Sequence, residues 1–454
     1  MPDLAALVNE RIDSFLGTLF CLLRFKSVSA DPLCRQEISR CSDWLVDYLR
    51  KLLGHAEANA DYGLPVVYAE TPAVSDRPTV LLYGHYDVQP AQSEDGWTTD
   101  PFEPQVIDGR IVARGIADNK GPLMVYLSAL ELLKALGPLP VNVKIILEGE
   151  EESAGDAIVK YIEAHREKLR CDLIISTDAG GFGRGRPALT YGYRGMVYKQ
   201  IDVVGPNQDL HSGSFGGLVP NPAQALVRIL DRLVEPDGKI NVPGLYDKVR
   251  PIDPEEHERI AALPRTTEQY LGGIKVKGLV GESEFLPMER LWCRPNLCIN
   301  GVVSGYTGAG AKTVLPARAS AKLSVRIVPD QKPEEISDLL DRAILDLADP
   351  AVDVTIETLG TAEPFLGLRT GPAVDAACRA SQEVAGVEPA RVREGGTVPI
   401  MAFFKRHLTD NILALGFTTP DCGAHGPNEF FNLADFRQGI QIVGLMFNYL
   451  RNVK

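Results

Sequence analysis

The stretch VLLYGHYDVQP (Val80–Pro90) decides the fold class. A continuous apolar run, Val80 to Tyr83, passes through one glycine into the polar residues His85 and Asp87. Strands that lack polar alternation are buried on both faces, and their alternation with helical patterns predicts an α/β sheet flanked by helices. Further apolar runs of this kind occur at 66–69, 111–113, 143–147 and 173–176, and helical periodicity occurs at 38–53 and 123–133.

The pattern changes after about Thr190. In 321–328, AKLSVRIV, apolar and polar residues alternate strictly, and 352–357 does the same, which predicts strands with one face exposed to water. The α/β pattern returns after about Leu366, so we expect an α/β domain built from 1–189 and 367–454 with an α+β domain, 190–366, inserted. Helical patterns occur at 222–233 and 333–347 in the insert, and at 374–384 and 433–450 beyond it.

Composition excludes several function classes. The chain has 47 Lys and Arg against 60 Asp and Glu, a formal charge of −13, which repels nucleic acids and anionic lipids. The N-terminal 25 residues lack a basic region before the apolar stretch and predict an amphipathic helix, not a signal peptide; no run of 18 apolar residues predicts a membrane span. The eight cysteines form no CxxC pair, which favours reduced thiols and a cytoplasmic protein.

Five short strings place His or carboxylate side chains in glycine-bearing loops. His, Asp and Glu are zinc ligands, and a paired site needs one carboxylate that binds both ions. Each string alone also has a structural explanation, because Asp at strand ends and acids at helix starts are common caps. Together they are expected at one sheet edge, where α/β sites form, and both interpretations stay open at this point. The strings are GHYDVQP (84–90), ADNKGP (117–122), EGEEESAG (148–155), STDAG (176–180) and GAHGPNE (423–429).

These strings resemble the signature of the di-zinc amidohydrolases that include aminoacylase, carboxypeptidase G and succinyl-diaminopimelate desuccinylase. Within that superfamily the chain is most similar to the carnosinase-like cytosolic dipeptidases. The similarity extends into the insert through DLHSGSFGG (209–217), KTVLP (312–316) and SVRIVP (324–329), and just beyond it through REGGTVPI (393–400). It implies a catalytic α/β domain with a central mixed sheet, and a smaller lid through which two chains form a homodimer.

The resemblance also implies roles for single residues. One zinc ion would be bound by His85 and Asp178, the other by Glu152 and His425, and Asp118 would bridge them; manganese or cobalt could substitute. Glu151 would be the general base that takes a proton from a water between the ions. Asp87 would orient His85. In the family the peptide bond after the bridging aspartate is cis, here Asp118 to Asn119.

Four further residues are expected to bind substrate. Arg326 would bind the terminal carboxylate of a small peptide, with Thr397 and Thr313 contributing hydroxyl or backbone groups. His211 would reach the partner subunit's active site and polarise the scissile carbonyl. The long, charged segment 237–295 resembles the lid insertion of the dipeptidase branch, and this resemblance favours dipeptides as substrates. An N-acyl amino acid deacylase or short-peptide carboxypeptidase with the same metals is the alternative, and a non-enzymatic zinc protein is disfavoured because Glu151 is present.

Overall fold

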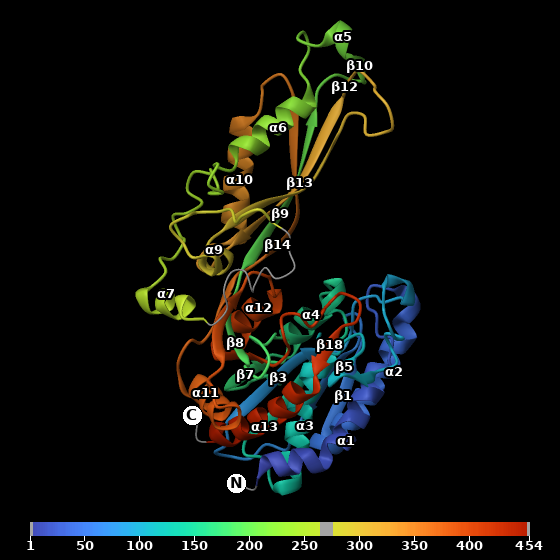
Figure 1. Ribbon diagram of the computed structural model, residues 1–454, viewed down its shortest axis with the longest axis vertical. Helices are drawn as coiled ribbons and strands as arrows, with labels where there is room; N and C mark the ends of the chain where they lie inside the picture. Colours follow the sequence, from blue (N-terminus) through green and yellow to red (C-terminus); the bar gives the residue numbers. More distant parts are fainter. Residues whose placement is uncertain (1–2, 264–275, 452–454) are drawn as a thin grey trace. The chain divides into compact units, whose positions relative to one another are not determined.

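The computed structural model describes residues 3–263 and 276–451, which form two compact units (Figure 1). The first unit comprises 1–191, 367–392 and 403–454, and the second comprises 192–366 and 393–402. The second unit therefore begins two residues after the start expected from sequence and ends at the expected residue. The second unit also includes 393–402, which the sequence pattern assigned to the second part of the α/β domain, 367–454.

The first unit is built on a mixed sheet in which four neighbouring strands are parallel. Its strand order is β1-β2-β6-β3-β7-β17-β8-β15, where β15 is Phe365–Leu366, and β16 (Ala390–Glu394) also pairs with β8. β6, β3, β7 and β17 run parallel, so their carboxyl ends meet at one edge, whereas β1, β2 and β8 pair antiparallel. The bounds are β1 (His55–Asn59), β2 (Val66–Glu70), β3 (Thr79–His85), β6 (Asn142–Glu148), β7 (Leu173–Ser176), β8 (Ala188–Tyr193) and β17 (Ile412–Gly416).

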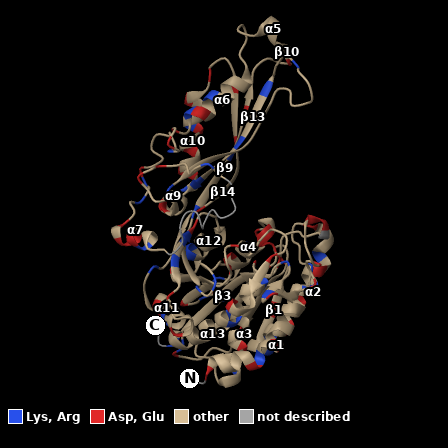
Figure 2. Ribbon diagram, viewed as in Figure 1, with Lys and Arg blue, Asp and Glu red and all other residues tan. Residues whose placement is uncertain are grey.

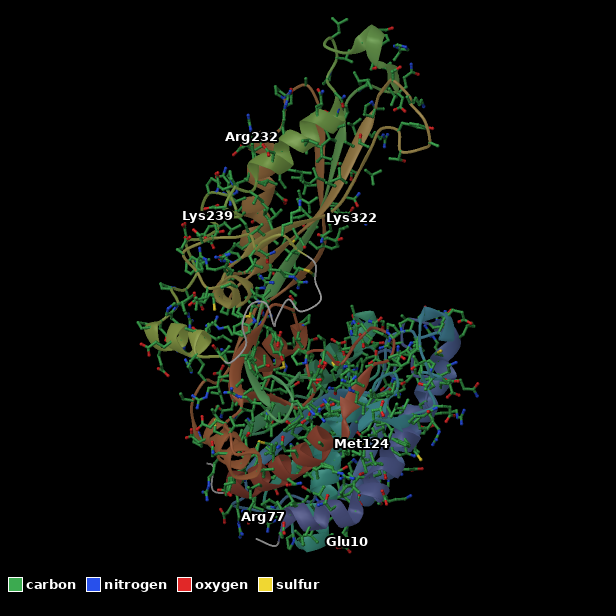
Figure 3. The ribbon with its side chains drawn as sticks, viewed as in Figure 1. Glu10, Arg77, Met124, Arg232, Lys239 and Lys322 are labelled. Atoms are coloured by element: carbon green, nitrogen blue, oxygen red, sulfur yellow. The ribbon has the colours of Figure 1, made fainter. Side chains whose placement is uncertain are left out.

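Helices cover this sheet, as the apolar strands predict. A layer of four helices packs together in Figure 1: α1 (Leu4–Leu23), α3 (Lys120–Leu136), α11 (Pro372–Ala385) and α13 (Leu433–Leu450). Met124 of α3 is fully buried in this unit (Figure 3). Two further helices, α2 (Arg35–Leu53) and α4 (Ala157–Ala164), pack against β2. A small sheet joins β18 (Phe430–Asn432), β5 (Arg110–Val112) and β4 (Gln105–Ile107).

The second unit is an antiparallel sheet with helices on one face. The strand order is β11 (Asn296–Ser304), β13 (Arg318–Ile327), β9 (Gly195–Val204), β14 (Asp353–Ala362). The alternation predicted for β13 is confirmed: its apolar residues are buried with α6 (Pro222–Arg232) and α10 (Pro333–Leu347). Lys322 and Arg326 alternate with them and so lie on the opposite face; Lys322 is labelled in Figure 3.

Several short elements complete the second unit. One end of its sheet carries β10 (Leu210–His211), α5 (Ser212–Phe215) and β12 (Val314–Leu315), which lie side by side in Figure 1. The others are α7 (Pro254–Ala261), α9 (Pro287–Cys293) and β15 (Phe365–Leu366). Two elements contain the ends of the segment 393–402, namely β16 (Ala390–Glu394) and α12 (Pro399–His407).

The surface properties agree with the composition. Acidic and basic residues are interspersed along both units, and α7 carries red segments in Figure 2 because it contains three glutamates. The eight cysteines all lie in the described part of the chain and are all free. Within residues 3–263 and 276–451, no helix combines the length and apolarity needed to cross a membrane.

Candidate metal centre

The parallel strands explain why distant ligand candidates converge. His85 is the last residue of β3, Asp178 follows β7, and Glu152 lies in the 3-10 turn Glu151–Ser153 after β6. Asp118 precedes α3, and His425 lies in the loop between β17 and β18. Since β6, β3, β7 and β17 are parallel neighbours, their carboxyl ends bring these loops to one edge of the sheet.

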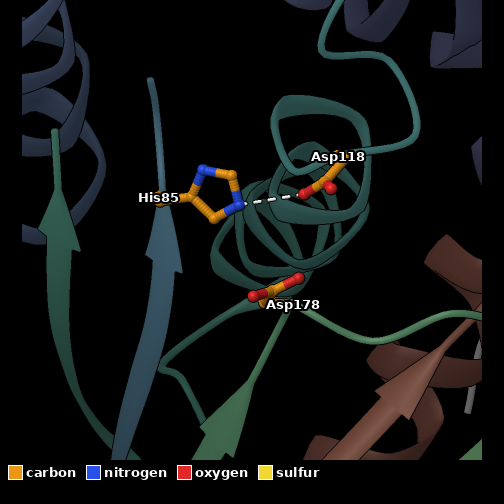
Figure 4. Close-up of side chains that lie close together, drawn as sticks. All are labelled: His85, Asp118 and Asp178. Atoms are coloured by element: carbon orange, nitrogen blue, oxygen red, sulfur yellow. Dashed lines mark hydrogen bonds and ion pairs between the residues drawn. The ribbon is translucent and has the colours of Figure 1, made fainter. Parts of the chain in front are cut away.

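One group of three joins His85, Asp118 and Asp178, and Figure 4 shows these side chains facing one another. Their ligand atoms all lie within 4.8 Å of one another. His85 Nε2 is 2.9 Å from Asp118 Oδ1, the dashed contact in Figure 4. His85 itself is fully buried, so its imidazole is held in place at the strand end.

A second group joins Asp118, Glu152 and His425 under the same distance limit of 4.8 Å. His425 Nε2 lies 3.1 Å from Asp118 Oδ2 and 3.3 Å from Glu152 Oε2. The two oxygens of Asp118 therefore face different histidines, one in each group. A carboxylate in this position can bridge two cations, which is the role that the sequence resemblance gave to Asp118.

The charges of the site favour a cation. Burial chiefly, with repulsion from Asp118, raises the pKa of Asp178 to about 8. Hydrogen bonds that His425 donates to Asp118 and then to Glu152 raise its pKa to about 10. Burial opposes ionisation of Asp118, yet hydrogen bonds from His425 and His85 hold its pKa below the usual range. The carboxylates are thus crowded enough to disfavour charge on Asp178, and divalent cations would relieve that repulsion.

One buried atom supports the same conclusion independently. Glu152 Oε1 is buried and has no hydrogen-bond partner within the described residues. The other oxygen, Glu152 Oε2, accepts a hydrogen bond of 2.8 Å from Gln89 Nε2. An orphaned buried carboxylate oxygen is costly unless a cation binds it. The donor set of two imidazoles and three carboxylates fits two ions such as zinc.

Asp87 supports both His85 and the turn that carries Glu151 and Glu152. Its Oδ1 and Oδ2 accept hydrogen bonds of 3.3 Å and 3.0 Å from the backbone N–H groups of Glu151 and Glu152. His85 Nδ1 lies 3.1 Å from the Asp87 carbonyl oxygen and 3.4 Å from Asp87 Oδ1. The backbone carbonyl of Asp87 is therefore the nearer of the two oxygens to His85 Nδ1.

Glu151 belongs to neither ligand group, although it is adjacent to Glu152 in the chain. Burial raises its pKa, and His85, Glu152 and Asp118 also act on it electrostatically. A carboxylate with a raised pKa beside, but outside, a metal site has the properties that a general base needs.

Asn119, the residue after Asp118, packs closely against the backbone of Gly84 near the end of β3. The Asp118–Asn119 peptide bond is cis, as the family resemblance implied. Asn119 Oδ1 accepts a hydrogen bond of 2.7 Å from the Thr177 hydroxyl, and this contact passes over Gly84. A Cβ at Gly84 would lie 2.5 Å from Thr177 Oγ1 and 2.8 Å from Asn119 Oδ1, so only glycine fits there. Asn119, Thr177 and Gln89 are supporting residues that the sequence did not reveal.

Arg326 and Thr397 come together in the second unit, as expected. The half-buried Arg326 donates a hydrogen bond from Nη1 to the Thr397 hydroxyl. Arg194 holds the same loop, because its Nε donates to the Gly395 carbonyl at 2.9 Å. Burial lowers the pKa of Arg326, which lies far above neutrality in any case, so the guanidinium stays charged. A half-buried guanidinium with donors to spare is suited to a carboxylate.

Thr313 lies with His211 and not with Arg326. The Ser212 N–H donates to the Thr313 carbonyl at 3.1 Å, and His211 pairs with Val314 across β10 and β12. Both His211 and Thr313 are exposed. Because β12 ends at Leu315, just before β13 begins at Arg318, His211 and Thr313 lie toward the Arg318 end of β13. Arg326 stands near the opposite end of that strand, roughly 26 Å from Arg318 at about 3.3 Å per residue. The second unit of a single chain therefore presents two separate sets of candidate substrate residues, Arg326 with Thr397 and His211 with Thr313.

Comparisons with known proteins show the family of the chain. The family model described as peptidase family M20/M25/M40 matches residues 81–448. The Cys-Gly metallodipeptidase dug1 of Schizosaccharomyces pombe is 33% identical, over 97% of this chain and 96% of its own length. The crystal structure of human carnosine dipeptidase 1 is 30% identical with a TM-score of 0.82, covering 99% of this chain and 98% of that one.

A third relative is named for a different activity. The M20 metallo-carboxypeptidase Sso-CP2 from Sulfolobus solfataricus is 32% identical with a TM-score of 0.84, covering 96% of this chain and 99% of that one. The chain belongs to peptidase family M20/M25/M40. It is a metallopeptidase, a metal-dependent hydrolase of peptide bonds.

Proposed function

We propose that this metallopeptidase is a dipeptidase that hydrolyses the amide bond of small peptides with a free carboxylate. The observation that carries the proposal is the pair of ligand groups that share Asp118, with Glu151 beside them and outside both. The relatives support the substrate class, because dug1 and carnosine dipeptidase 1 are named as dipeptidases. The name of Sso-CP2 also fits, since a carboxypeptidase recognises a free C-terminal carboxylate.

In this proposal His85 and Asp178 would hold one zinc ion, Glu152 and His425 would hold the other, and Asp118 would contribute to both. When bound, the ions supply a Lewis acid and make water nucleophilic near neutral pH. Glu151 takes the proton of the attacking water and delivers it to the leaving amine. Asp87 keeps Glu151 and Glu152 in place through their backbone N–H groups and fixes His85.

The proposed assembly is a cytoplasmic homodimer formed through the second unit, which serves as a lid. Arg326 and Thr397 bind the substrate carboxylate of their own chain's site, and His211 with Thr313 act at the partner subunit's site. The separation of these two sets along β13 supports this division, because a fully extended dipeptide is only about 7 Å long. The two sets of a single chain are therefore too far apart to contact the same dipeptide.

A substrate panel tests the activity. Zinc-loaded protein should hydrolyse free dipeptides faster than N-acetyl or N-succinyl amino acids, and faster than longer peptides. The measurement is kcat/KM for each substrate by quantifying the released amino acid. Hydrolysis of acyl amino acids alone would replace the dipeptidase proposal with the deacylase alternative.

Changing Arg326→Met tests the recognition of the carboxylate. Loss of charge-assisted hydrogen bonds worth about 1.5–3 kcal/mol should lower kcat/KM for dipeptides about 10–100-fold, mainly through KM. Lys322→Met is the matched control, since Lys322 is an exposed cation on the same face of β13. The wild type should prefer a free carboxylate over a C-terminal amide, and Arg326→Met should lose this preference. An unchanged preference in Arg326→Met would contradict the assignment.

A further inference from the structure

Glu429 is a buried carboxylate at the metal centre for which the sequence gave no role. It ends the GAHGPNE string, four residues after His425, and its exposed fraction is 0%. Each of its oxygens accepts two hydrogen bonds. Oε1 accepts from the backbone N–H groups of Ala117 and Asp118 at 2.6 Å and 3.0 Å. Oε2 accepts from Arg114 Nη1 at 2.6 Å and from the backbone N–H of Gly115 at 3.0 Å.

These four bonds join segments that are far apart in the sequence. The segment 114–118 ends at Asp118, whose carboxylate is shared by the two ligand groups. The strand β18, which begins at Phe430, pairs with β5, and the Glu429 carbonyl accepts from the Ala113 N–H at 3.2 Å. Arg114 Nη2 also donates to the Pro90 carbonyl at 3.3 Å, at the end of the string that contains His85. The Arg114–Glu429 pair thus touches three of the five strings.

We infer that Glu429 is a positioning residue for the metal centre, which fixes the shared carboxylate of Asp118 relative to His425. This inference rests on the proposed metal site. The backbone N–H of Asp118 is bound by the segment that carries His425, so neither ligand moves without the other. Ligands held in place before the ions bind lose less conformational freedom on binding, which strengthens metal affinity.

The hydrogen-bond pattern requires a carboxylate at this position. An ionised carboxylate offers about four acceptor sites, and the four donors around Glu429 use all of them. A glutamine has the same shape but only one acceptor oxygen, so its NH2 group would face two donors. Because the site is buried, water cannot replace the lost bonds. Glu429→Gln should therefore displace the Asp118 segment without changing the packing volume.

The test measures zinc affinity directly, by competition of the metal-free protein with a chromogenic zinc chelator. The expected result for Glu429→Gln is dissociation constants raised about 10–100-fold, with two ions still bound per chain at high zinc. At saturating zinc, kcat should fall while KM for a dipeptide stays unchanged, because Arg326 is untouched. Should Glu429→Gln not fold, Glu429→Asp, which is one methylene shorter, is measured with the same expected direction.

Asp435→Asn is the matched control. Asp435 is also a buried carboxylate that accepts a backbone hydrogen bond, from Gly185 N–H at 2.9 Å, but it belongs to neither ligand group. Its substitution should lower the unfolding temperature of the metal-free protein and leave zinc affinity unchanged. If the Glu429 variant also keeps wild-type zinc affinity, Glu429 is only structural and the inference is wrong. A wild-type protein that binds no zinc would instead refute the proposed metal site.

Discussion

Replacing Glu151 with Gln should remove most of the turnover and leave the metal content near two ions per chain. Gln has the shape of Glu but cannot accept a proton, and general base catalysis contributes about 10²–10⁴-fold. Metal binding should persist because Glu151 lies outside both ligand groups. The measurements are kcat on a dipeptide and zinc content by atomic absorption. A Glu151→Gln protein with full activity would exclude Glu151 as the base.

The adjacent glutamates provide two controls for this experiment. Glu152→Gln should lower the zinc content, because Glu152 belongs to the second ligand group. Glu150→Gln should keep turnover and lose some stability, because Glu150 accepts backbone hydrogen bonds from Leu64 and Ala157 at 3.1 Å and 2.8 Å. The three substitutions are thus expected to lower three different quantities: stability for Glu150, turnover for Glu151 and zinc content for Glu152. Removal of one negative charge from this region would not by itself produce such a difference.

The sequence predicted the sheet that carries this site because the relevant signals are local. The apolar run before His85 and the runs at 143–147 and 173–176 became the parallel strands β3, β6 and β7. The strict alternation in β13 likewise identified its buried face. The edge strand β11 was not predicted, since its residues after Leu297 are mainly exposed and it has no regular alternation.

Long-range contacts explain what the sequence could not provide. Gln89 and Glu429 lie inside two of the quoted strings, but their partners, Glu152 and the segment 114–118, are far away in the chain. His425 adopts a φ of 63°, in the left-handed region, so a strand or helix pattern could not predict its direction. The pairing of β10 with β12, which brings Thr313 beside His211, is likewise a contact between distant parts of the chain.

The geometry of His211 supports a role at a partner subunit's site. Its Nδ1 accepts a hydrogen bond of 3.1 Å from the Gly213 N–H, which assigns the proton of the neutral imidazole to Nε2. That Nε2–H is then a donor on an exposed side chain, as polarising a carbonyl oxygen requires. Phe215 and Leu218, four and seven residues further along the chain, are 40% and 82% exposed, so this end of the second unit exposes apolar side chains. Such surface is suited to burial against another subunit.

Mixing two inactive proteins, His211→Ala and Glu151→Gln, should therefore restore activity. The His211 change alone should lower kcat about 10²–10³-fold, as loss of an oxyanion donor does. In a mixed dimer, the site that retains Glu151 receives the intact His211 of the partner, while the other site carries both changes. Random exchange at equal concentrations should yield roughly one quarter of wild-type activity, because half of the dimers are mixed and each has one intact site. If exchange is verified by differently tagged chains and activity does not return, His211 acts within its own chain or has no catalytic role.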